Sequence, residues 1–222
     1  MNAHHSGRLQ THDVAFRERR RVLNGGSGPH TPHSLHAIFK NDGWREVRLD
    51  ISPAAQPDVV ASITNMRAFF GPGSFDAVWS SHSLEHLHSH EVPLALAEFR
   101  RILKPNGFVL MRCPDLEAVV SLLVDRGTDH VAYTSPIGPI TPLDMLFGHA
   151  ASIAAGNRHM PHKTGFTATR LGHLLLDADF ATVFTRSVRF DLWALALMKQ
   201  AEESAIEGQF RAAGIAGFYA VH

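Results

Sequence analysis

The chain lacks several features that would assign it to an oxidising compartment or a membrane. Cys113 is the single cysteine among 222 residues, which excludes an internal disulfide framework and favours a reducing cytoplasm. No apolar run approaches the roughly 20 residues that a transmembrane helix needs. The first residues, MNAHHSGRLQTHD, contain no apolar core of the kind found in a signal peptide. We therefore expect a cytoplasmic protein with no membrane partner.

The chain also lacks net charge, because 21 basic residues balance 21 acidic ones. No global field then draws it towards nucleic acid, although residues 17–21 form a local basic cluster. The hydrophobic fraction of 45% and the charged fraction of 19% are typical of a globular protein. A chain of this length and composition predicts one domain with a sizeable core.

The most informative stretch runs from Phe75 to Asp115. It begins with the apolar run at residues 75–79, continues with apolar residues at helical spacing over 92–103, and ends the helix at Lys104-Pro105-Asn106-Gly107. A second apolar strand follows over 108–111. Two strands joined in this way predict a right-handed parallel βαβ unit. Ligands of such sheets bind beyond the carboxyl ends of the strands, so residues 80–86 and 112–115 are predicted to line a crevice.

Two earlier segments add to this sheet. Val22 and Leu23 end a strand, and the turn at residues 24–29 contains three glycines, whose backbone can approach a ligand closely because no Cβ intervenes. An ordinary Gly/Ser loop is the alternative. The following segment, 30–40, predicts only a short helix. Residues 44–51 alternate as a second strand with Asp50 at its end, and 58–63 predict a third. The Asp50 carboxylate either accepts hydrogen bonds from a ribose diol or caps the Ser-Pro turn that follows it.

The carboxyl-terminal half predicts further elements. Residues 116–124 and 167–178 have helical patterns, and Thr167 is the expected N-cap of the second. Residues 128–166 are irregular, apart from a helix expected over 142–155, and a segment of this kind is usually functional or mobile. Residues 181–190 and 192–198 predict two hairpin strands, and 200–213 a polar helix or tail.

Four motifs in this order make residues 20–200 resemble a class I S-adenosylmethionine-dependent methyltransferase, and most closely the predicted methyltransferases called type 11. They are Asn24-Gly25-Gly26-Ser27-Gly28 after the first strand, Asp50 after the second, FDAVWSSHSLEHL at the fourth, and Arg101–Gly107 before the fifth. The resemblance implies an α/β, Rossmann-like fold with a mostly parallel seven-stranded sheet, a C-terminal antiparallel hairpin and helices on both faces. From the patterns above we expect a flexible tail over 1–16, a single domain over 17–200 with a cap-like insertion at about 128–166, and a terminal helix or tail over 201–222.

The resemblance also implies the cofactor, S-adenosyl-L-methionine, with S-adenosyl-L-homocysteine as product. The implied cofactor-binding residues are Asn24, Gly25, Gly26, Ser27, Gly28, Asp50, Ile51, Ser62, Ile63, Ser81 and His82. Two positions depart from the family pattern, because His30 replaces the third glycine and Ser62 replaces an aspartate often placed near the adenine. A protein that binds the cofactor but turns over slowly therefore remains an alternative to an active enzyme.

Methyl transfer from a sulfonium requires mainly that donor and acceptor be aligned, and it needs a base only when the acceptor must lose a proton. The candidate bases are His82 and His86, after the fourth strand, and His162 in the insertion; each has a packing or surface role as its alternative. The expected acceptor is a small or sugar-like molecule that the sequence does not identify. A nucleic-acid acceptor is disfavoured, and a homodimer is left open.

A metal site is a competing interpretation of the 16 histidines. His82, Glu85 and His86 fit H-x-x-E-H, the inverted zinc-peptidase motif. A zinc peptidase needs both histidines on one face of a continuous helix, whereas His82 is expected at the exit of a strand. We therefore expect no metal and disfavour a zinc hydrolase. Cys113 has no predicted base or helix N-terminus to activate it, and we expect a buried, unreactive thiol.

Overall fold

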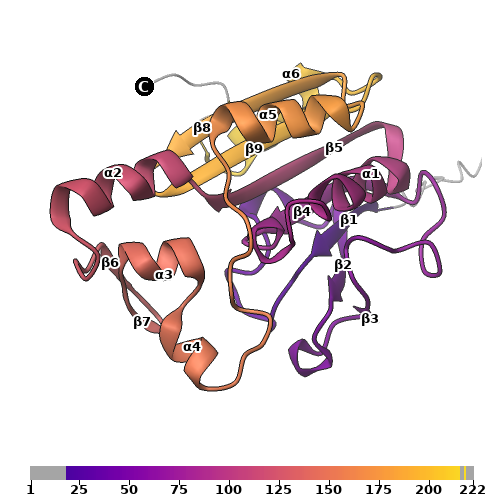
Figure 1. Ribbon diagram of the computed structural model, residues 1–222. Coiled ribbons are helices and arrows are strands. Elements are labelled where there is room, and N and C mark those ends of the chain that lie inside the picture. Colours follow the sequence, from indigo (N-terminus) through magenta and orange to yellow (C-terminus); the bar gives the residue numbers. More distant parts are fainter. Residues whose placement is uncertain (1–18, 216–217, 219–222) are drawn as a thin grey trace, which may run out of the picture.

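Seven strands form one sheet in the computed structural model, which describes residues 19–215 and residue 218 (Figure 1). The predicted tail over 1–16 lies outside the described residues. The strands are β1 (Arg20–Gly25), β2 (Trp44–Asp50), β3 (Val59–Val60), β4 (Phe75–Ser81), β5 (Leu103–Pro114), β8 (Thr182–Val188) and β9 (Asp191–Leu197). Their order in the sheet is β3-β2-β1-β4-β5-β9-β8.

The sheet is mixed but mostly parallel. Strands β1 to β5 pair in parallel, and β9 runs antiparallel to both of its neighbours, β5 and β8. The predicted parallel sheet and its C-terminal antiparallel hairpin are therefore confirmed. In this order, the carboxyl ends of β1 and β4 lie side by side, with Gly25 opposite Ser80. This edge is where the predicted binding residues gather.

Alternating side chains give the sheet two buried faces. Leu23, Val78 and Val109 belong to one core cluster, whereas their neighbours Val22 and Trp79 belong to the other. Helices α1 (Val92–Ile102) and α5 (Ala168–Asp177) cover the first face. The short 3-10 helix η1 (Ala37–Phe39) and helix α6 (Glu203–Ala212) cover the second. Helices thus cover both faces, as the resemblance implies.

Three predicted elements differ from those observed. The third strand pairs over only two residues, not over 58–63, and β5 begins at Leu103 rather than at 108 because Leu103 already pairs with Phe75 across a register shift. The helix predicted over 142–155 is broken into α3 (Pro142–Phe147) and α4 (Ala150–Ala154). Gly148 separates them with a φ of 95°, and a Cβ on it would collide with the carbonyl oxygen of Met160.

The crossover from β1 to β2 carries very little helix. Along residues 26–43, all of which the structure describes, η1 is the single helical turn. The weak apolar pattern of residues 30–40 predicts this outcome. Helix α6, from the far end of the chain, packs Ile206 and Phe210 into the same cluster as Ile38 and Phe39 of η1. A distant helix therefore helps to cover the face that this crossover leaves open.

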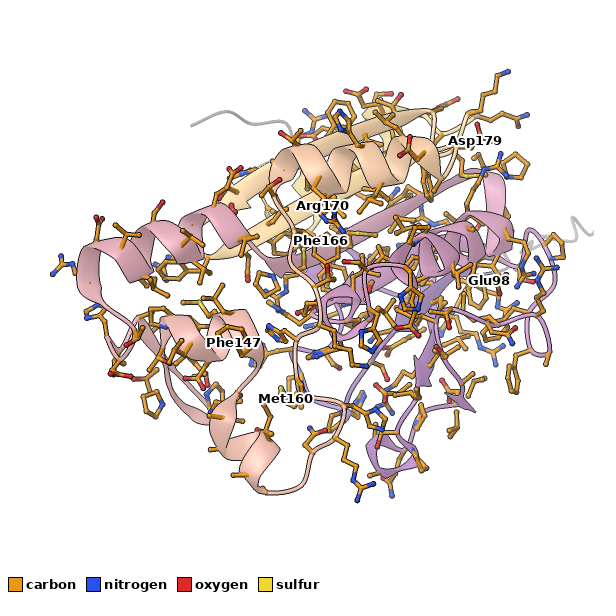
Figure 2. All side chains as sticks on the ribbon, in the orientation of Figure 1. Glu98, Phe147, Met160, Phe166, Arg170 and Asp179 are labelled. Carbon is orange, nitrogen blue, oxygen red and sulfur yellow. The ribbon has the colours of Figure 1, made fainter. Side chains whose placement is uncertain are left out.

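The segment between β5 and α5 forms a small subassembly beside the sheet (Figure 1). It comprises α2 (Leu116–Arg126), β6 (Tyr133–Ser135), β7 (Gly138–Ile140), α3 and α4, with Val119, Ile140 and Met145 in a cluster of their own. Residues 160–166, which we call the strap, connect it to α5. Figure 2 labels Met160 and Phe166 near the two ends of the strap; Phe166 is fully buried in the sheet core. Among the described helices, none has the length and apolar character needed to cross a membrane.

Candidate functional site

The glycine turn after β1 is hydrogen-bonded to the end of β2. The amides of Gly26 and Ser27 both donate to the carbonyl of Leu49, at 2.9 and 3.0 Å. The amide of Gly28 donates to Asp50 Oδ2 at 2.8 Å. Gly26 and Gly28 have φ values of 72° and 58°, a conformation that glycine adopts without the strain a side chain would add. The turn is therefore a preformed backbone loop held by the neighbouring strand.

Asp50 is the main support of this loop. Its second oxygen, Oδ1, accepts from the amide of Ser52 at 2.8 Å, and the residue is only 9% exposed. Each carboxylate oxygen can accept more than one hydrogen bond, so two backbone amides do not exhaust this acceptor. Arg48 adds a second brace, because its guanidinium donates to the carbonyls of Gly28, Ala55 and Gln56.

Five other predicted cofactor-binding residues, from Asn24 to Ile63, lie in three different places. Gly25 lies against the side chain of Ile63, and the Ser62 hydroxyl pairs with that of Thr64 at 2.8 Å, so this group adjoins the glycine loop. Asn24 instead turns into the other face of the sheet. Its amide donates to Glu46 at 2.7 Å and to a loop carbonyl, and the residue is buried. Ile51 lies at the surface, 49% exposed.

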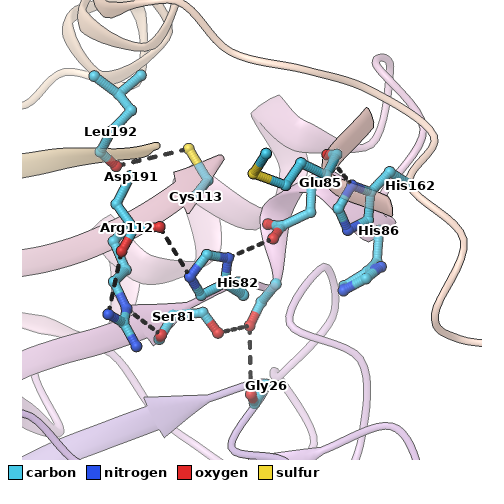
Figure 3. A network of polar contacts seen from close by, with 12 residues as sticks. Gly26, Ser81, His82, Glu85, His86, Arg112, Cys113, His162, Asp191 and Leu192 are labelled. Atoms are coloured by element: carbon cyan, nitrogen blue, oxygen red, sulfur yellow. Dashed lines mark hydrogen bonds and ion pairs between the residues drawn. The ribbon is translucent and has the colours of Figure 1, made fainter. Parts of the chain in front are cut away.

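A network of charged groups begins at the carboxyl end of β4 (Figure 3). His82 has a left-handed backbone, with φ 50°, and its ring lies between two carboxylates. Nδ1 is 3.2 Å from Glu85 Oε1, and Nε2 is 3.3 Å from Asp191 Oδ1. Arg112 joins the network by an ion pair with Asp191 at 3.3 Å and a hydrogen bond to Ser81 Oγ at 2.8 Å. The ends of β4, β5 and β9 are thereby connected.

These contacts fix the charge of His82. Burial of the ring disfavours its protonation, but the hydrogen bonds and charges of Asp191 and Glu85 outweigh that effect and raise the pKa of His82 to about 9. At neutral pH both ring nitrogens then carry protons and donate to the carboxylates. A protonated imidazole has no lone pair to accept a proton, so His82 is the least suited of the three histidines to act as a base.

The other two candidate histidines lie together beside Glu85 (Figure 3). Glu85 and His86 belong to the single 3-10 turn η3 (Leu84–His86), and His162 lies on the strap. The ring centroids of His86 and His162 are 4.9 Å apart. Burial lowers the pKa of His162 in spite of the nearby Glu85 charge, so its ring is neutral at pH 7. Burial would raise the pKa of Glu85, but the hydrogen bond and charge of His82 lower it, which keeps the carboxylate ionised.

Backbone contacts determine where the strap places His162. The amide of Lys163 donates to the Glu85 carbonyl at 2.7 Å, and the amide of His162 donates to the Phe147 carbonyl at 3.1 Å. A cavity of about 210 Å³ borders this region. It is lined by His82, Glu85, His86, Tyr133, Asp144, His162, Phe190 and Asp191, among others. The crevice expected after β4 and β5 is thus closed on one side by the insertion.

Residues 23–111 match the model of the methyltransferase domain family. Among solved structures with the same fold is 1,6-didemethyltoxoflavin-N1-methyltransferase of Burkholderia thailandensis, with bound 1,6-didemethyltoxoflavin and S-adenosylhomocysteine, at 19% identity. It aligns with 81% of this chain and 71% of its own, at a TM-score of 0.51. Residues 23–111 therefore resemble a methyltransferase domain, and the sheet as a whole has the fold of class I methyltransferases. No protein of curated function matches it significantly.

Two further methyltransferase structures share the fold. A SAM-dependent methyltransferase from Archaeoglobus fulgidus is 15% identical over 82% of this chain and 87% of its own, at a TM-score of 0.53. The CMeT domain of the citrinin polyketide synthase is 14% identical, at a TM-score of 0.54. The match covers 83% of this chain and 47% of the synthase chain, so this chain spans about half the length of that protein. At such low identities, these likenesses establish the fold alone.

The geometry after β4 does not support the zinc-peptidase motif. His82 has a left-handed backbone and η3 is one turn long, so His82 and His86 do not lie on one continuous helix. Among the described residues, the potential metal ligands that lie close to one another are Glu85, His86 and His162. Cys113 is buried as predicted, and burial raises the pKa of its thiol well above the usual value.

No local pattern indicates Asp191 as a site residue, because it is an acid in an expected hairpin turn. Its role depends on the register that places it opposite Pro114, at the end of β5. Glu85 belongs to two motifs of the sequence, H-x-x-E-H and FDAVWSSHSLEHL, but neither leads to a predicted site role for it. An acid that follows a strand and stands between two histidines is the signal in the sequence that could have indicated it, and the structure shows this acid to be buried.

Proposed function

We propose that this chain is an S-adenosylmethionine-dependent methyltransferase acting on a small or sugar-like acceptor. The observation that carries the proposal is the preformed loop over residues 26–28, hydrogen-bonded to Asp50 at the adjoining carboxyl ends of β1 and β2. Dinucleotides and related ligands bind at this place in open α/β sheets. The neighbour from Burkholderia thailandensis, which holds S-adenosylhomocysteine and a small acceptor, supports the same assignment.

The cofactor-binding residues are proposed with separate roles. Each carboxylate oxygen of Asp50 accepts one backbone amide and keeps a further lone pair. With these lone pairs Asp50 accepts hydrogen bonds from the ribose hydroxyls. Gly26 and Gly28 allow backbone to lie against the methionine part, and Ser62 and Ile63 flank the adenine. The cofactor supplies a methyl group on a sulfonium, whose departure needs no proton. The task of the chain is then to align donor and acceptor, which is worth several kcal/mol.

The acceptor is proposed to occupy the cavity of about 210 Å³ near His82 and His162. Carboxylates and imidazoles in its lining suit a polar molecule that carries hydroxyl or amine groups. The insertion at 128–166 would act as its cap. The balanced charge of the chain favours such an acceptor over nucleic acid. If the acceptor must lose a proton, the neutral His162 is better suited to take it than the charged His82.

A second candidate function is cofactor binding with little turnover. It is favoured by the short η1 turn, which leaves the glycine loop without a long following helix, and by Ser62, whose hydroxyl bonds to Thr64. Fold alone never establishes activity. Consumption of S-adenosylmethionine in the presence of cell extract, compared with binding alone, separates the two candidates.

Titration calorimetry with S-adenosylhomocysteine tests the binding site. We expect the wild-type protein to bind and Asp50→Ala to bind at least about 10-fold more weakly, because a hydrogen bond to a charged group contributes about 1.5–3 kcal/mol and the loop loses its support. Asp42→Ala is the matched control, since Asp42 is an exposed acid on the approach to the same strand. Tight binding that Asp50→Ala leaves unchanged would contradict the ribose assignment. Thermal melting establishes that each variant is folded.

A further inference from the structure

Three potential metal ligands from two distant parts of the chain meet near the cavity. One ligand atom each from Glu85, His86 and His162 lies within 4.8 Å of the other two. The first two residues belong to the turn after β4, and the third belongs to the strap. Two imidazoles and one carboxylate are a common ligand set for zinc and other divalent transition metals.

Both imidazoles are oriented as metal ligands usually are. His86 Nδ1 lies 3.2 Å from the carbonyl oxygen of Pro161, and His162 Nδ1 lies 2.9 Å from that of Met145. A carbonyl accepts but does not donate, so each Nδ1 carries the proton. That tautomer leaves the lone pair on Nε2, the nitrogen available to an ion. A ligating histidine almost always donates its other N–H to a carbonyl or carboxylate in this way.

Glu85 supplies the second, independent observation. The residue is only 1% exposed, and its Oε1 pairs with His82. Its Oε2 is buried and has no hydrogen-bond partner among the described residues. A buried carboxylate oxygen without a partner is costly, and it requires an explanation such as an ion. His82 meanwhile orients the carboxylate, which is the usual role of a group behind a ligand.

We propose that Glu85, His86 and His162 bind one divalent transition-metal ion of the zinc type. Around an ion at about 2.1 Å, ligand atoms lie roughly 3.5 Å apart, so binding draws the three groups inward by about 1 Å through side-chain rotation. The backbone on both sides is already connected, because Lys163 donates to the Glu85 carbonyl. Three protein ligands leave a coordination position open towards the neighbouring cavity. This proposal does not depend on the methyltransferase function. While the ion is bound, the Nε2 lone pair of His162 is coordinated, so His162 serves as a base only in the metal-free protein.

Metal binding to the tag-free, full-length protein tests the proposal. After treatment with a chelator, the protein is titrated with Zn²⁺ by calorimetry, and the retained zinc is measured after dialysis by mass spectrometry. We expect one equivalent in the wild type, and a loss of at least about 100-fold in affinity for that equivalent in His162→Gln and Glu85→Gln. His90→Gln is the matched control, since His90 is an exposed histidine outside the cluster. It should retain the equivalent in full.

Two outcomes would overturn the proposal: less than one equivalent in the wild type, or an equivalent that His162→Gln and His90→Gln retain equally. Histidines near the amino terminus can bind zinc weakly, but that binding is common to all variants and cancels in the comparison. If Glu85→Gln does not fold, His86→Gln takes its place. S-adenosylhomocysteine binding is measured on the same samples, so failure of the metal site and failure of the proposed function are distinguished.

Discussion

At the scale of single residues, the position of His82 between Glu85 and Asp191 makes the stability of the fold depend on pH. Its pKa is raised from 6.5 to about 9 in the folded protein. A group with a raised pKa stabilises the fold fully below its unfolded pKa, and the stabilisation is lost as pH rises through the folded value. We therefore expect the free energy of unfolding to fall between about pH 6.5 and pH 9.

Urea denaturation at a series of pH values measures this effect in His82→Gln. The His82 side chain as a whole is 40% exposed, so solvent screening reduces the expected pH-dependent loss in the wild type to the order of 1 kcal/mol. In His82→Gln the decline should be nearly absent, whereas His90→Gln should show it in full. An equally steep decline in His82→Gln would contradict the assignment. His36 and His162 do not contribute to the change between pH 6.5 and pH 9, because their lowered pKa values affect the free energy of unfolding only at lower pH.

At the scale of elements, the two loop glycines differ in what surrounds them. A Cβ on Gly26 would collide with the hydroxyl of Ser83 and lie 2.7 Å from its Cβ, whereas a Cβ on Gly28 meets nothing within 4 Å. Both have positive φ, so alanine at either position costs about 1–2 kcal/mol in backbone strain. Gly26→Ala should add an overpacking cost of about 1–3 kcal/mol, as measured by chemical denaturation.

Gly28→Ala is thus the control for backbone strain alone. Replacing Ser83 by glycine in the Gly26→Ala background removes the colliding atoms, and it should recover the overpacking part of the loss but not the strain. Equal destabilisation by Gly26→Ala and Gly28→Ala would show that Ser83 yields without cost. That result would mean that the close contact between Gly26 and Ser83 does not limit the size of the residue at position 26.

Local sequence predicts the position of a residue well when the regular geometry of strands and helices determines that position. The glycine loop and Asp50 were predicted because parallel strands align their carboxyl ends, which brings these residues together whatever the loops do. The meeting of His162 with Glu85 could not be predicted in this way. It depends on contacts such as that between His86 and Pro161, which are 75 residues apart, and on a strap without periodic pattern.

Strand ends show the same limit. The apolar pattern predicts the middle of β5, but the pairing of Leu103 with Phe75 adds residues that no alternation marks. Likewise, β3 keeps only Val59 and Val60 as a strand, because pairing with β2 ends where the chain turns away. Asp191 entered the site through the register of the terminal hairpin. In each case a contact with another element determines the structure, and such contacts leave no signature in the local sequence.

At the scale of the whole molecule, the sheet face beside η1 depends on the end of the chain for its cover. Ile206 and Phe210 of α6 are each only 3% exposed, and they share a cluster with Trp79 and Phe108. The ring of Phe210 also lies 5.9 Å from that of His36, whose pKa burial lowers to about 4. With so little helix between β1 and β2, α6 supplies apolar contacts that the crossover does not provide.

Phe210→Ala measures this contribution. Removing a buried phenylalanine typically costs about 3–5 kcal/mol, so we expect a loss of this size in the free energy of unfolding of the whole domain. Phe147→Ala is the matched control, because Phe147 lies on the insertion with 63% of its surface exposed, and its removal should change stability by less than about 0.5 kcal/mol (Figure 2). A small, similar effect of both substitutions would mean that α6 is dispensable. A large loss in Phe210→Ala alone would make α6 an integral part of the fold, since the helix then stabilises the sheet that positions the glycine loop over residues 26–28.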